Sequence, residues 1–444
     1  MKSLLTSIYL GRRFFIALGA FAVCFVLSYL YPWMYPFVKS GFNIFLFVVL
    51  FDAFLLYAVR RGIEAARISA EKLSNGDDNP FTLRISSAYL FPVQLKIYDE
   101  LPSQFQVRDT YFETTVQPRS TGEIHYTLRP LKRGNYNFGA INVFVHSPLA
   151  LIVRRYREQQ GLNLPVYPSF IQMRKYEFLA IHNRLQMSGI KKIRRIGNNY
   201  EFEQIKDYVQ GDDYRTVNWK ATARKGSLMV NQYQDERSQN LYCIIDKGRV
   251  MKMPFQQLSL LDYSINATLA LCNIAIRKSD KAGVLTFNEN KIQYLKAENR
   301  NSQMMRIADM LHQQKTRYLE SNYEALYIQL RTLVNQRSLV VLFTNFESLS
   351  GMQRNLTYLK RIAKHHTLIV VFFENTELQS LTESKARSLE EIYIKTIAEK
   401  FVFEKKQIVL ELQQHGIHTI LTAPQHLTVN TINKYLELKA RGIL

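Results

Sequence analysis

The sequence is short of cysteine and of acidic residues, and each shortage narrows the possibilities. Its 444 residues include three cysteines, Cys24, Cys243 and Cys272, each inside an apolar run. They form no readable disulfide framework, which fits a reducing compartment and small buried side chains. The 37 Asp and Glu face 58 Lys and Arg, a formal net charge of +21. This balance predicts an anionic neighbour, which is nucleic acid, a lipid surface or an acidic protein.

The motifs of several enzyme classes are also missing. The chain has no G-x-x-x-x-G-K-[ST] phosphate loop and no H-E-x-x-H zinc motif. Its cysteines lack the spacing of metal ligands, and the pair His415 and His418 straddles a predicted helix-to-strand turn. Asp212 and Asp213 are adjacent carboxylates with no histidine or nucleophile in fixed relation to them. We therefore expect a protein that is not an enzyme and needs no cofactor.

Two apolar runs stand near the N-terminus. Phe14 to Val38 carries no charge, and Gly41 to Val59 is interrupted by Asp52 alone. Each run is near the ~20 residues that cross a bilayer. Arginine pairs flank the two runs, and tyrosines and Trp33 lie between them. Because arginine stays on the cytoplasmic side and aromatic residues gather at the interface, we expect residues 1–62 to form a helical hairpin. The protein would then cross the inner (cytoplasmic) membrane twice, with both termini in the cytoplasm.

A cleaved signal peptide is the alternative to this hairpin. No polar cleavage zone follows the first run, however, and a second run comes after it. Asp52 is an acid within an expected membrane span, which favours either a functional role or a role in helix pairing near the interface.

Two regions of different periodicity follow. Arg60 to Pro80 predicts a polar, amphipathic exit that ends in a turn-rich linker. Residues 78–170 contain short segments rich in Val, Ile, Thr and Tyr, separated by Pro or Gly turns. That pattern predicts a small all-β sandwich domain.

Residues 237–444 alternate between apolar strands and helices. The segments "SLVVLFT" and "TLIVVFF" are continuous apolar strands, as a parallel sheet covered on both faces requires. A long helix is expected over Ser388 to His415. The sequence therefore predicts a doubly wound α/β domain.

Polar side chains end two strands of this domain. Asp246 ends one, and Thr344 and Asn345 end another. Because ligands bind at the carboxyl ends of strands in open α/β sheets, an acid and hydroxyls there are candidate ligands of Mg²⁺. Lys247 and Arg249 follow Asp246, however, and place positive charge where a cation would sit. We expect no bound magnesium, and we expect Asp246 to cap a turn or form an ion pair.

A basic connector and a charged segment occupy residues 171–236. The connector carries Lys191, Lys192, Arg194 and Arg195 without the interleaved aromatics of a base-stacking platform. Attraction to anionic lipid, a solvated face or docking of an acidic protein explains this cluster better than nucleic acid does.

The charged segment reads "EFEQIKDYVQGDDYRTVNWKATARKGSLMVNQYQDE". It resembles the signature of the bacterial family called domain of unknown function 58. Lys206 stands where that family usually has Arg, which keeps the charge but loses the bidentate fork. The positions that carry the resemblance are Glu201, Phe202, Tyr208, Gly211, Asp212, Asp213, Arg215, Trp219, Lys220, Ala223 and Arg224.

The resemblance covers nearly the whole chain and implies a membrane anchor, a β-domain and a C-terminal von Willebrand factor A-like domain. Such domains hold a metal with a D-x-S-x-S motif and a later Asp. Asp246 matches the first Asp, whereas Gly248 and Val250 replace both serines and Asn345 occupies the position of the later Asp. The resemblance thus implies a degraded metal site at Asp246, Thr344 and Asn345. It also implies a MoxR-type AAA+ ATPase as partner.

The sequence leads to one hypothesis and one alternative. The hypothesis is a membrane-anchored, cytoplasmic-facing scaffold or adaptor that works with a MoxR-type ATPase in the assembly or maturation of protein complexes. The alternative is a metal-dependent ligand-binding von Willebrand A domain protein. The signature segment is expected to be a polar brace or a docking surface. In the brace, Trp219 packs between the two domains, and Arg215 and Arg224 pair with Asp212, Asp213 or Glu236.

Overall fold

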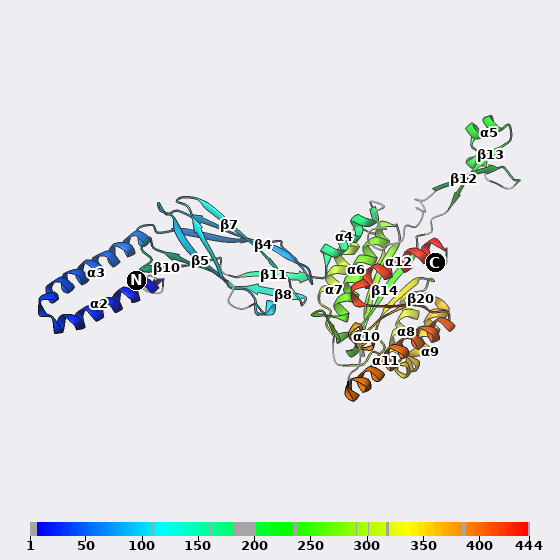
Figure 1. Cartoon of the computed structure of the whole chain (residues 1–444). Coiled ribbons are helices and arrows are strands. Elements are labelled where there is room, and N and C mark those ends of the chain that lie inside the picture. The colour runs from blue at the N-terminus through cyan, green and yellow to red at the C-terminus, as the bar shows by residue number, and fades with distance from the viewer. Residues whose placement is uncertain are drawn as a thin grey trace. The chain divides into compact units, whose positions relative to one another are not determined.

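The computed structural model describes residues 7–107, 111–159, 161–181, 201–210, 212, 214–234, 238–289, 291–300, 302–316, 319–383 and 388–442. The chain divides into two compact units, Met1–Tyr167 and Pro168–Leu444, which are described separately (Figure 1).

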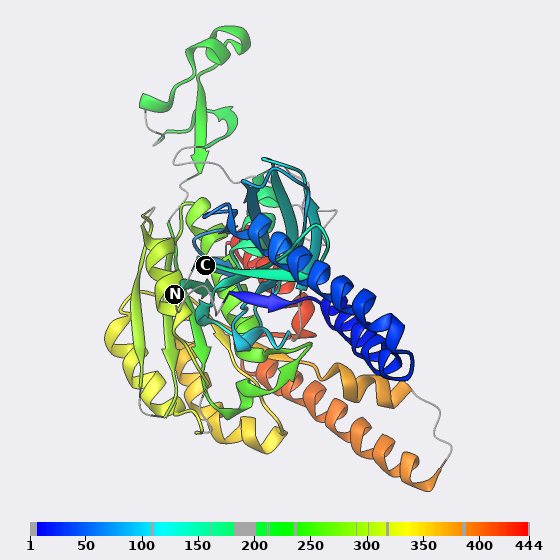
Figure 2. The ribbon, with the colours of Figure 1, turned by 90° about the vertical axis from the view of Figure 1, so that its left-hand side faces the viewer.

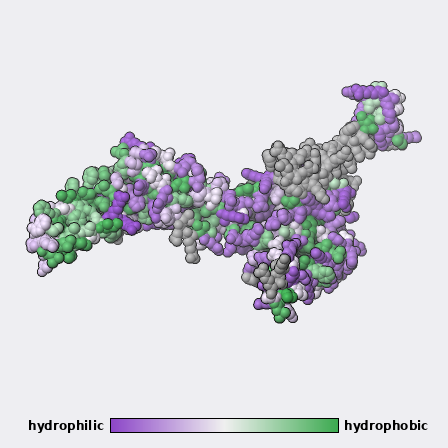
Figure 3. Space-filling model, in the orientation of Figure 1, coloured by the Kyte–Doolittle hydropathy of each residue, from purple (hydrophilic) through white to green (hydrophobic). Residues whose placement is uncertain are grey.

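Two apolar helices open the first unit. Helices α2 (Arg12–Leu30) and α3 (Tyr35–Tyr57) are joined by a short 3-10 turn, η1 (Pro32–Met34), and both are long and apolar enough to cross a membrane. Their facing sides pack through aromatic rings, with Phe21 lying 5.7 Å from Phe42 and 5.3 Å from Phe45 between ring centroids. Their outer sides expose apolar side chains, which appear as the green surface of the hairpin in Figure 3. Such a surface suits lipid rather than water.

The carboxyl end of α3 is packed into the β-rich region that follows. Leu56 is buried in its core, and the Asp52 carboxylate accepts a hydrogen bond from the Ser147 hydroxyl. Arg154 donates to the carbonyl oxygens of Leu56 and Val59, at 2.6 and 2.8 Å, and so caps the helix. Asp52 therefore attaches the helix to the β-rich region.

The β-rich region consists of three sheets, with strand orders β1-β10-β9-β5-β6, β2-β4-β7 and β3-β11-β8. Apart from the parallel pair β3 and β11, neighbouring strands run antiparallel. The strands are β1 (Ile8–Leu10), β2 (Ile63–Ile68), β3 (Leu73–Ser74), β4 (Asn79–Ser87), β5 (Val93–Asp99), β6 (Tyr111–Val116), β7 (Thr121–Leu128), β8 (Gly134–Phe138), β9 (Ile141–His146), β10 (Ile152–Glu158) and β11 (Leu162–Tyr167).

Alternating side chains build the core of this region. Leu83 and Ile85 of β4 face Leu95 and Ile97 of β5 across a common buried cluster, so the first two sheets pack face to face. The predicted β-rich character is confirmed, but its predicted start at residue 78 is too late. The stretch interpreted as a polar exit and linker forms β2 and β3, because every second residue of β2 is buried.

The second unit is a mixed α/β structure around a six-stranded sheet of order β18-β17-β14-β19-β20-β21. All neighbouring strands are parallel except the antiparallel pair β17 and β18, so the sheet is mixed rather than purely parallel. The strands are β14 (Asn240–Asp246), β17 (Lys281–Phe287), β18 (Gln293–Glu298), β19 (Leu339–Phe343), β20 (Thr367–Phe373) and β21 (His418–Thr422); a small separate pair is formed by β15 (Pro254–Phe255) and β16 (Leu258–Ser259).

Helices cover both faces of this sheet. The helices are α4 (Phe170–Ile181), α6 (Leu260–Arg277), α7 (Gln303–His312), α8 (Tyr323–Leu333), α9 (Leu349–His365), α10 (Thr376–Glu383), α11 (Leu389–Gln414) and α12 (Leu427–Ala440), with 3-10 turns η5 (Arg249–Lys252) and η6 (Pro424–His426). Along β14, Cys243 and Ile245 belong to the core shared with α6 and α12, whereas Tyr242 and Ile244 belong to the core shared with α8 and α9. Figure 2 shows α11, in orange, extending beyond the sheet, and its span matches the helix predicted from Ser388 to His415.

Helix α4 corrects the predicted boundary of the connector. It packs on α6 through Met173 and Tyr176, and Glu177 accepts hydrogen bonds from Asn273 at 2.9 Å and pairs with Arg277 at 2.5 Å. The start of the predicted connector, residues 171–236, therefore belongs to the α/β unit. The basic cluster from Lys191 to Arg195 lies outside the described residues.

Candidate functional site

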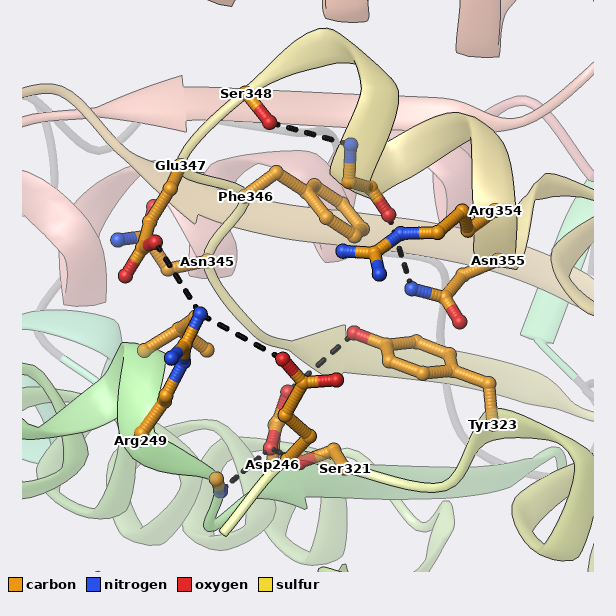
Figure 4. Close-up of a pocket in the computed structure, with 14 residues that line it drawn as sticks. Asp246, Arg249, Ser321, Tyr323, Asn345, Phe346, Glu347, Ser348, Arg354 and Asn355 are labelled. Carbon is orange, nitrogen blue, oxygen red and sulfur yellow. Dashed lines mark hydrogen bonds and ion pairs between the residues drawn. The ribbon is translucent and has the colours of Figure 1, made fainter. Parts of the chain in front are cut away.

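The strand order of the α/β unit marks one place for a ligand. If the six strands are numbered in the order in which they occur along the chain, their order across the sheet is 3-2-1-4-5-6. The direction in which successive strands are added therefore reverses beside β14. Open α/β sheets bind ligands in the crevice at the carboxyl ends of the strands at such a point. A pocket opens there between the end of β14, the segment after β19 and the start of α9 (Figure 4).

Asp246 forms the floor of this pocket and is 1% exposed. One carboxylate oxygen accepts the backbone N–H of Gly248, at 2.7 Å, and the Ser321 hydroxyl. The other accepts the hydroxyls of Thr344, at 2.7 Å, and Tyr323, at 3.3 Å. Burial raises the pKa of Asp246, and these four donors oppose the rise. The acid thus caps its own turn, one of the two roles predicted for it, and organises three hydroxyls.

Ser321 is a site residue that the sequence analysis missed. A Cβ atom at Gly248 would lie 2.3 Å from the Ser321 hydroxyl oxygen, so that oxygen fills the space of a side chain at position 248. The loop that contains Ser321 is held beside the turn after β14 because the N–H of Arg249 donates a hydrogen bond to the Leu319 carbonyl at 3.0 Å. The Ser321 hydroxyl, from a loop distant in sequence, therefore binds Asp246, although position 248 is a glycine and has no hydroxyl.

The side chains of Lys247 and Arg249, the two cations after Asp246, have different partners. Lys247 is buried and donates to the Gln314 side chain at 3.1 Å, away from the carboxylate. Arg249 lines the pocket and forms ion pairs with Glu320, at 3.5 Å, and Glu347, at 4.0 Å. Figure 4 shows Arg249 directed toward Glu347. Of the two cations, Arg249 thus lines the same pocket as Asp246, and Lys247 is not among the described residues that line it.

Of the three candidate metal ligands, the structure brings together two. Thr344 binds Asp246, but the side-chain oxygen of Asn345 accepts a hydrogen bond from the Lys405 amine at 2.8 Å. Within the described ranges, no group of three or more His, Cys, Asp or Glu side chains is arranged to hold a metal ion. The pocket is lined by one buried carboxylate, Asp246, by the two exposed carboxylates Glu320 and Glu347, and by hydroxyl groups.

An apolar cavity of about 320 Å³ adjoins this pocket and shares Asn345 and Glu347 with it. Phe373, Leu378 and Phe401 contribute to its apolar walls. Lys405 of α11 lines it and donates to Asn345 and to the Phe346 carbonyl. Burial lowers the pKa of Lys405 to about 8.

Lys405→Met is expected to change how stability depends on pH. Between the pKa of about 8 in the folded protein and the ordinary value of 10.5, the unfolded chain holds a proton that the folded protein has released. Stability from this group therefore rises with pH across that window. The free energy of unfolding of the wild type, relative to that of Lys405→Met, should therefore increase between about pH 8 and about pH 10. Chemical denaturation of both proteins at the two pH values measures the gain, and a constant difference would contradict it.

The signature segment forms a small structure of its own. Strands β12 (Glu201–Asp207) and β13 (Met229–Gln234) pair antiparallel, and η4 (Tyr214–Thr216) and α5 (Trp219–Lys225) lie between them in sequence. Asn218 caps α5 by accepting the N–H of Ala221 at 3.0 Å. Gly226 ends the helix at φ 74°, a left-handed conformation that favours glycine.

Lysines pair two acids of this segment among the described residues. Lys206 lies 2.9 Å from Asp212, and Lys225 lies 2.9 Å from Asp207. The Val209 N–H and Lys206 lower the pKa of Asp212. Lys206 therefore forms an ion pair with Asp212 and favours its ionised form. Arg224 is exposed and has no ion pair among the described residues.

Trp219 is 72% exposed, so the predicted brace lacks the buried ring that it requires. Tyr214 and Val209 are exposed as well, and Tyr208 lies 5.6 Å from Tyr214 between ring centroids. Lys220 is exposed beside Trp219. Gly211, Asp213 and Glu236, and the side chains of Glu201, Phe202 and Arg215, lie outside the described residues.

A comparison with protein families bears on this segment. The model described as "Protein of unknown function DUF58" matches residues 204–390. The match includes most of the signature segment and the α/β unit as far as the start of α11, whereas the resemblance was expected over nearly the whole chain.

The chain is also similar to individual proteins. "Uncharacterized protein YeaD" of Bacillus subtilis (strain 168) is 23% identical over 270 residues, which cover 58% of this chain and 65% of that protein. Among solved structures, the CARDB domain of the PF1109 protein from Pyrococcus furiosus is 10% identical, with 23% of this chain and 86% of that chain covered and a TM-score of 0.19. The ASH / PapD-like domain of human CEP192 is 13% identical, with 24% and 82% covered and a TM-score of 0.17. TM-scores this low carry no conclusion about the fold.

Proposed function

We propose that the protein is a membrane-anchored scaffold or adaptor that works with a MoxR-type AAA+ ATPase in the assembly or maturation of protein complexes. The observation that carries the proposal is the exposed signature segment. It presents Trp219, Tyr214 and Val209 to solvent, while its acids Asp207 and Asp212 are already paired. Beside them lie Lys220 and Arg224, which form no ion pair with any described residue, and exposed aromatic side chains beside such cations are typical of a surface that binds another protein.

The anchoring part of the proposal rests on α2 and α3, and its orientation on the arginine pairs at residues 12–13 and 60–61. These pairs favour both termini and both units on the cytoplasmic side of the inner membrane. The α/β unit is proposed to be von Willebrand A-like, which its strand order and the place of Asp246 at the end of the first strand support.

Trp219→Ala is expected to abolish recovery of the ATPase without lowering the thermal stability of the full chain. An exposed side chain buries little surface, so its loss should change the free energy of unfolding by no more than about 0.5 kcal/mol. The measurement is recovery of a purified MoxR-type ATPase from the same bacterium on the immobilised full chain in mild detergent, together with the thermal midpoint.

Two variants control this experiment. Trp219→Phe keeps an aromatic ring and should retain part of the binding. Asn218→Ala removes the cap of α5, which costs about 1 kcal/mol, but keeps Trp219. Loss of binding in Asn218→Ala equal to that in Trp219→Ala would point to folding of the segment rather than to contact. Unchanged binding in Trp219→Ala would reject this surface.

A metal-dependent ligand-binding protein is the second candidate, favoured by the carboxylate and three hydroxyls that converge at Asp246. We expect millimolar Mg²⁺ to leave the thermal midpoint of the wild type unchanged, because Lys405 occupies the Asn345 oxygen. A ligand of the folded state alone would raise the midpoint. A rise specific to magnesium that disappears in Asp246→Asn would favour the second candidate over the first.

A further inference from the structure

A groove of about 530 Å³ lies in the first unit where the chain enters the first apolar helix. Its walls come from β1, β5, β9 and β10 and from the first residue of α2. None of its lining residues lines the pocket at Asp246 or belongs to the signature segment, and of its residues the proposed function uses Arg12, for the orientation in the membrane.

The groove is positively charged. Arg12, Lys96 and Arg155 line it, and none of the described residues that line it is Asp or Glu. The acid paired with Lys96 is Glu113, at 3.5 Å, whose side chain is 65% exposed and lies outside the lining. Burial and the neighbouring Lys96 lower the pKa of His146, so the three longer side chains carry the positive charge at neutral pH.

Two of these cations are held in place. The Arg155 guanidinium donates to the Asn142 side-chain oxygen, at 2.7 and 3.0 Å, and to the Tyr9 hydroxyl at 3.3 Å. Three of its five N–H donors are thereby used, and its planar group is oriented while donors remain for a ligand. The Lys96 amine lies 3.8 Å from the centroid of the Tyr111 ring. Positioned cations of this kind suit a phosphate group.

Apolar and aromatic side chains form the rest of the wall. Phe144 lies 5.5 Å from Tyr9 and 5.6 Å from Tyr98, edge to face in both cases. Leu10 and Val153 add aliphatic surface. The groove thus pairs cations with an apolar wall, which fits an amphiphilic ligand better than a free ion.

The apolar helix begins inside this groove. Strand β1 pairs with β10, with Leu10 opposite Ile152, and the Gly11 N–H donates to the Leu151 carbonyl at 2.8 Å. Because a Cβ atom at Gly11 would lie 2.3 Å from the Ala150 carbonyl oxygen, the chain passes closely over the turn between β9 and β10 at this glycine. Helix α2 starts at the next residue, Arg12, which itself lines the groove. No linker separates the groove from the helix that is proposed to enter the bilayer.

We propose that this groove binds the phosphate headgroup of an anionic phospholipid from the cytoplasmic leaflet. The inference rests on the membrane anchoring in the proposed function but not on the ATPase partner. Basic pockets next to membrane helices recognise anionic headgroups by this combination of charge and position. The bound lipid would fix the depth and orientation of the β-rich region at the membrane surface.

The test measures the thermal midpoint of the full chain in dodecyl maltoside, without any partner protein. Short-chain phosphatidylglycerol, phosphatidylcholine and inorganic phosphate are titrated separately. Phosphatidylglycerol should raise the midpoint with saturation, whereas phosphatidylcholine and inorganic phosphate at the same concentrations should not. Lys96→Gln should weaken the apparent affinity for phosphatidylglycerol about tenfold, the effect of losing one charge-assisted contact.

Arg84→Gln is the matched control. Arg84 lies on β4 in the opposite sheet and, like Lys96, pairs with a glutamate, Glu123 at 2.9 Å. Arg84→Gln should keep the wild-type affinity for phosphatidylglycerol. If Arg84→Gln weakens this affinity as much as Lys96→Gln does, the result would overturn binding in the groove in favour of general charge attraction. Equal responses to the two lipids, or an equal response to inorganic phosphate, would also overturn the proposal. Retention of the chain in the membrane fraction after alkaline extraction checks the anchoring separately, so failure of the anchor and failure of the groove give different results.

Discussion

Arg67→Met is expected to lower the free energy of unfolding by about 3–5 kcal/mol, because it leaves a buried carboxylate without its cation. Arg67 of β2 is 4% exposed and Asp99 of β5 is 7% exposed. The guanidinium donates to both carboxylate oxygens, and the Tyr126 hydroxyl donates to one of them. Arg67 also lies 4.8 Å from the centroid of the Phe138 ring. Since β2 and β5 belong to different sheets, this ion pair joins the two layers of the β-rich region.

Two further variants separate burial from charge in that prediction. Arg84→Met removes an exposed arginine that pairs with Glu123, and should cost about 1 kcal/mol or less. Arg67→Met combined with Asp99→Leu removes both buried charges and should recover part of the loss. Urea denaturation of the full chain in mild detergent measures all three. A loss in Arg67→Met no larger than that in Arg84→Met would contradict the inferred role of the pair.

The same arginine shows why the start of the β-rich region was predicted too late. In "IEAARI" the buried positions are Ile63, Ala65 and Arg67, but a strand core is recognised by alternation of apolar residues. An arginine at a core position breaks that alternation, and its partner Asp99 stands 32 residues further along the chain. The periodicity of a sequence segment cannot predict an ion pair with a residue in another strand. The continuous apolar strands β19 and β20, by contrast, need no partner to be recognised, and their prediction was correct.

In the candidate site, the strand pattern of the sequence locates some residues and not others. Asp246 and Thr344 could be placed together, because both follow apolar strands whose carboxyl ends meet at one edge of the sheet. Ser321 and Lys405 could not, because Ser321 lies in the loop before α8 and Lys405 lies within α11, so neither follows a strand of the sheet. The sequence left open whether Trp219 packs in a brace or lies on a docking surface, and the structure shows it 72% exposed.

Asp246→Ala is expected to lower the free energy of unfolding by about 3–5 kcal/mol, because it leaves several buried donors without an acceptor at once. The donors are the Gly248 N–H and the hydroxyls of Ser321, Thr344 and Tyr323. Each buried unpaired donor costs about 1–3 kcal/mol, but the sum is not additive. Thr344 and Tyr323 lie 2.7 Å apart and can still bond to each other.

Asp246→Asn distinguishes the loss of the acceptor from the loss of the charge. The amide keeps one oxygen acceptor and nearly the same volume, and the three hydroxyls can rotate toward or away from it. Because burial raises the pKa of Asp246, the buried negative charge is itself unfavourable, and removing it offsets part of the lost hydrogen bonding. We therefore expect Asp246→Asn to cost about 1 kcal/mol, well below Asp246→Ala. Denaturation of the full chain in mild detergent measures both variants. Equal losses would show that the carboxylate charge, rather than its acceptor capacity, holds the end of β14 to the loops around it.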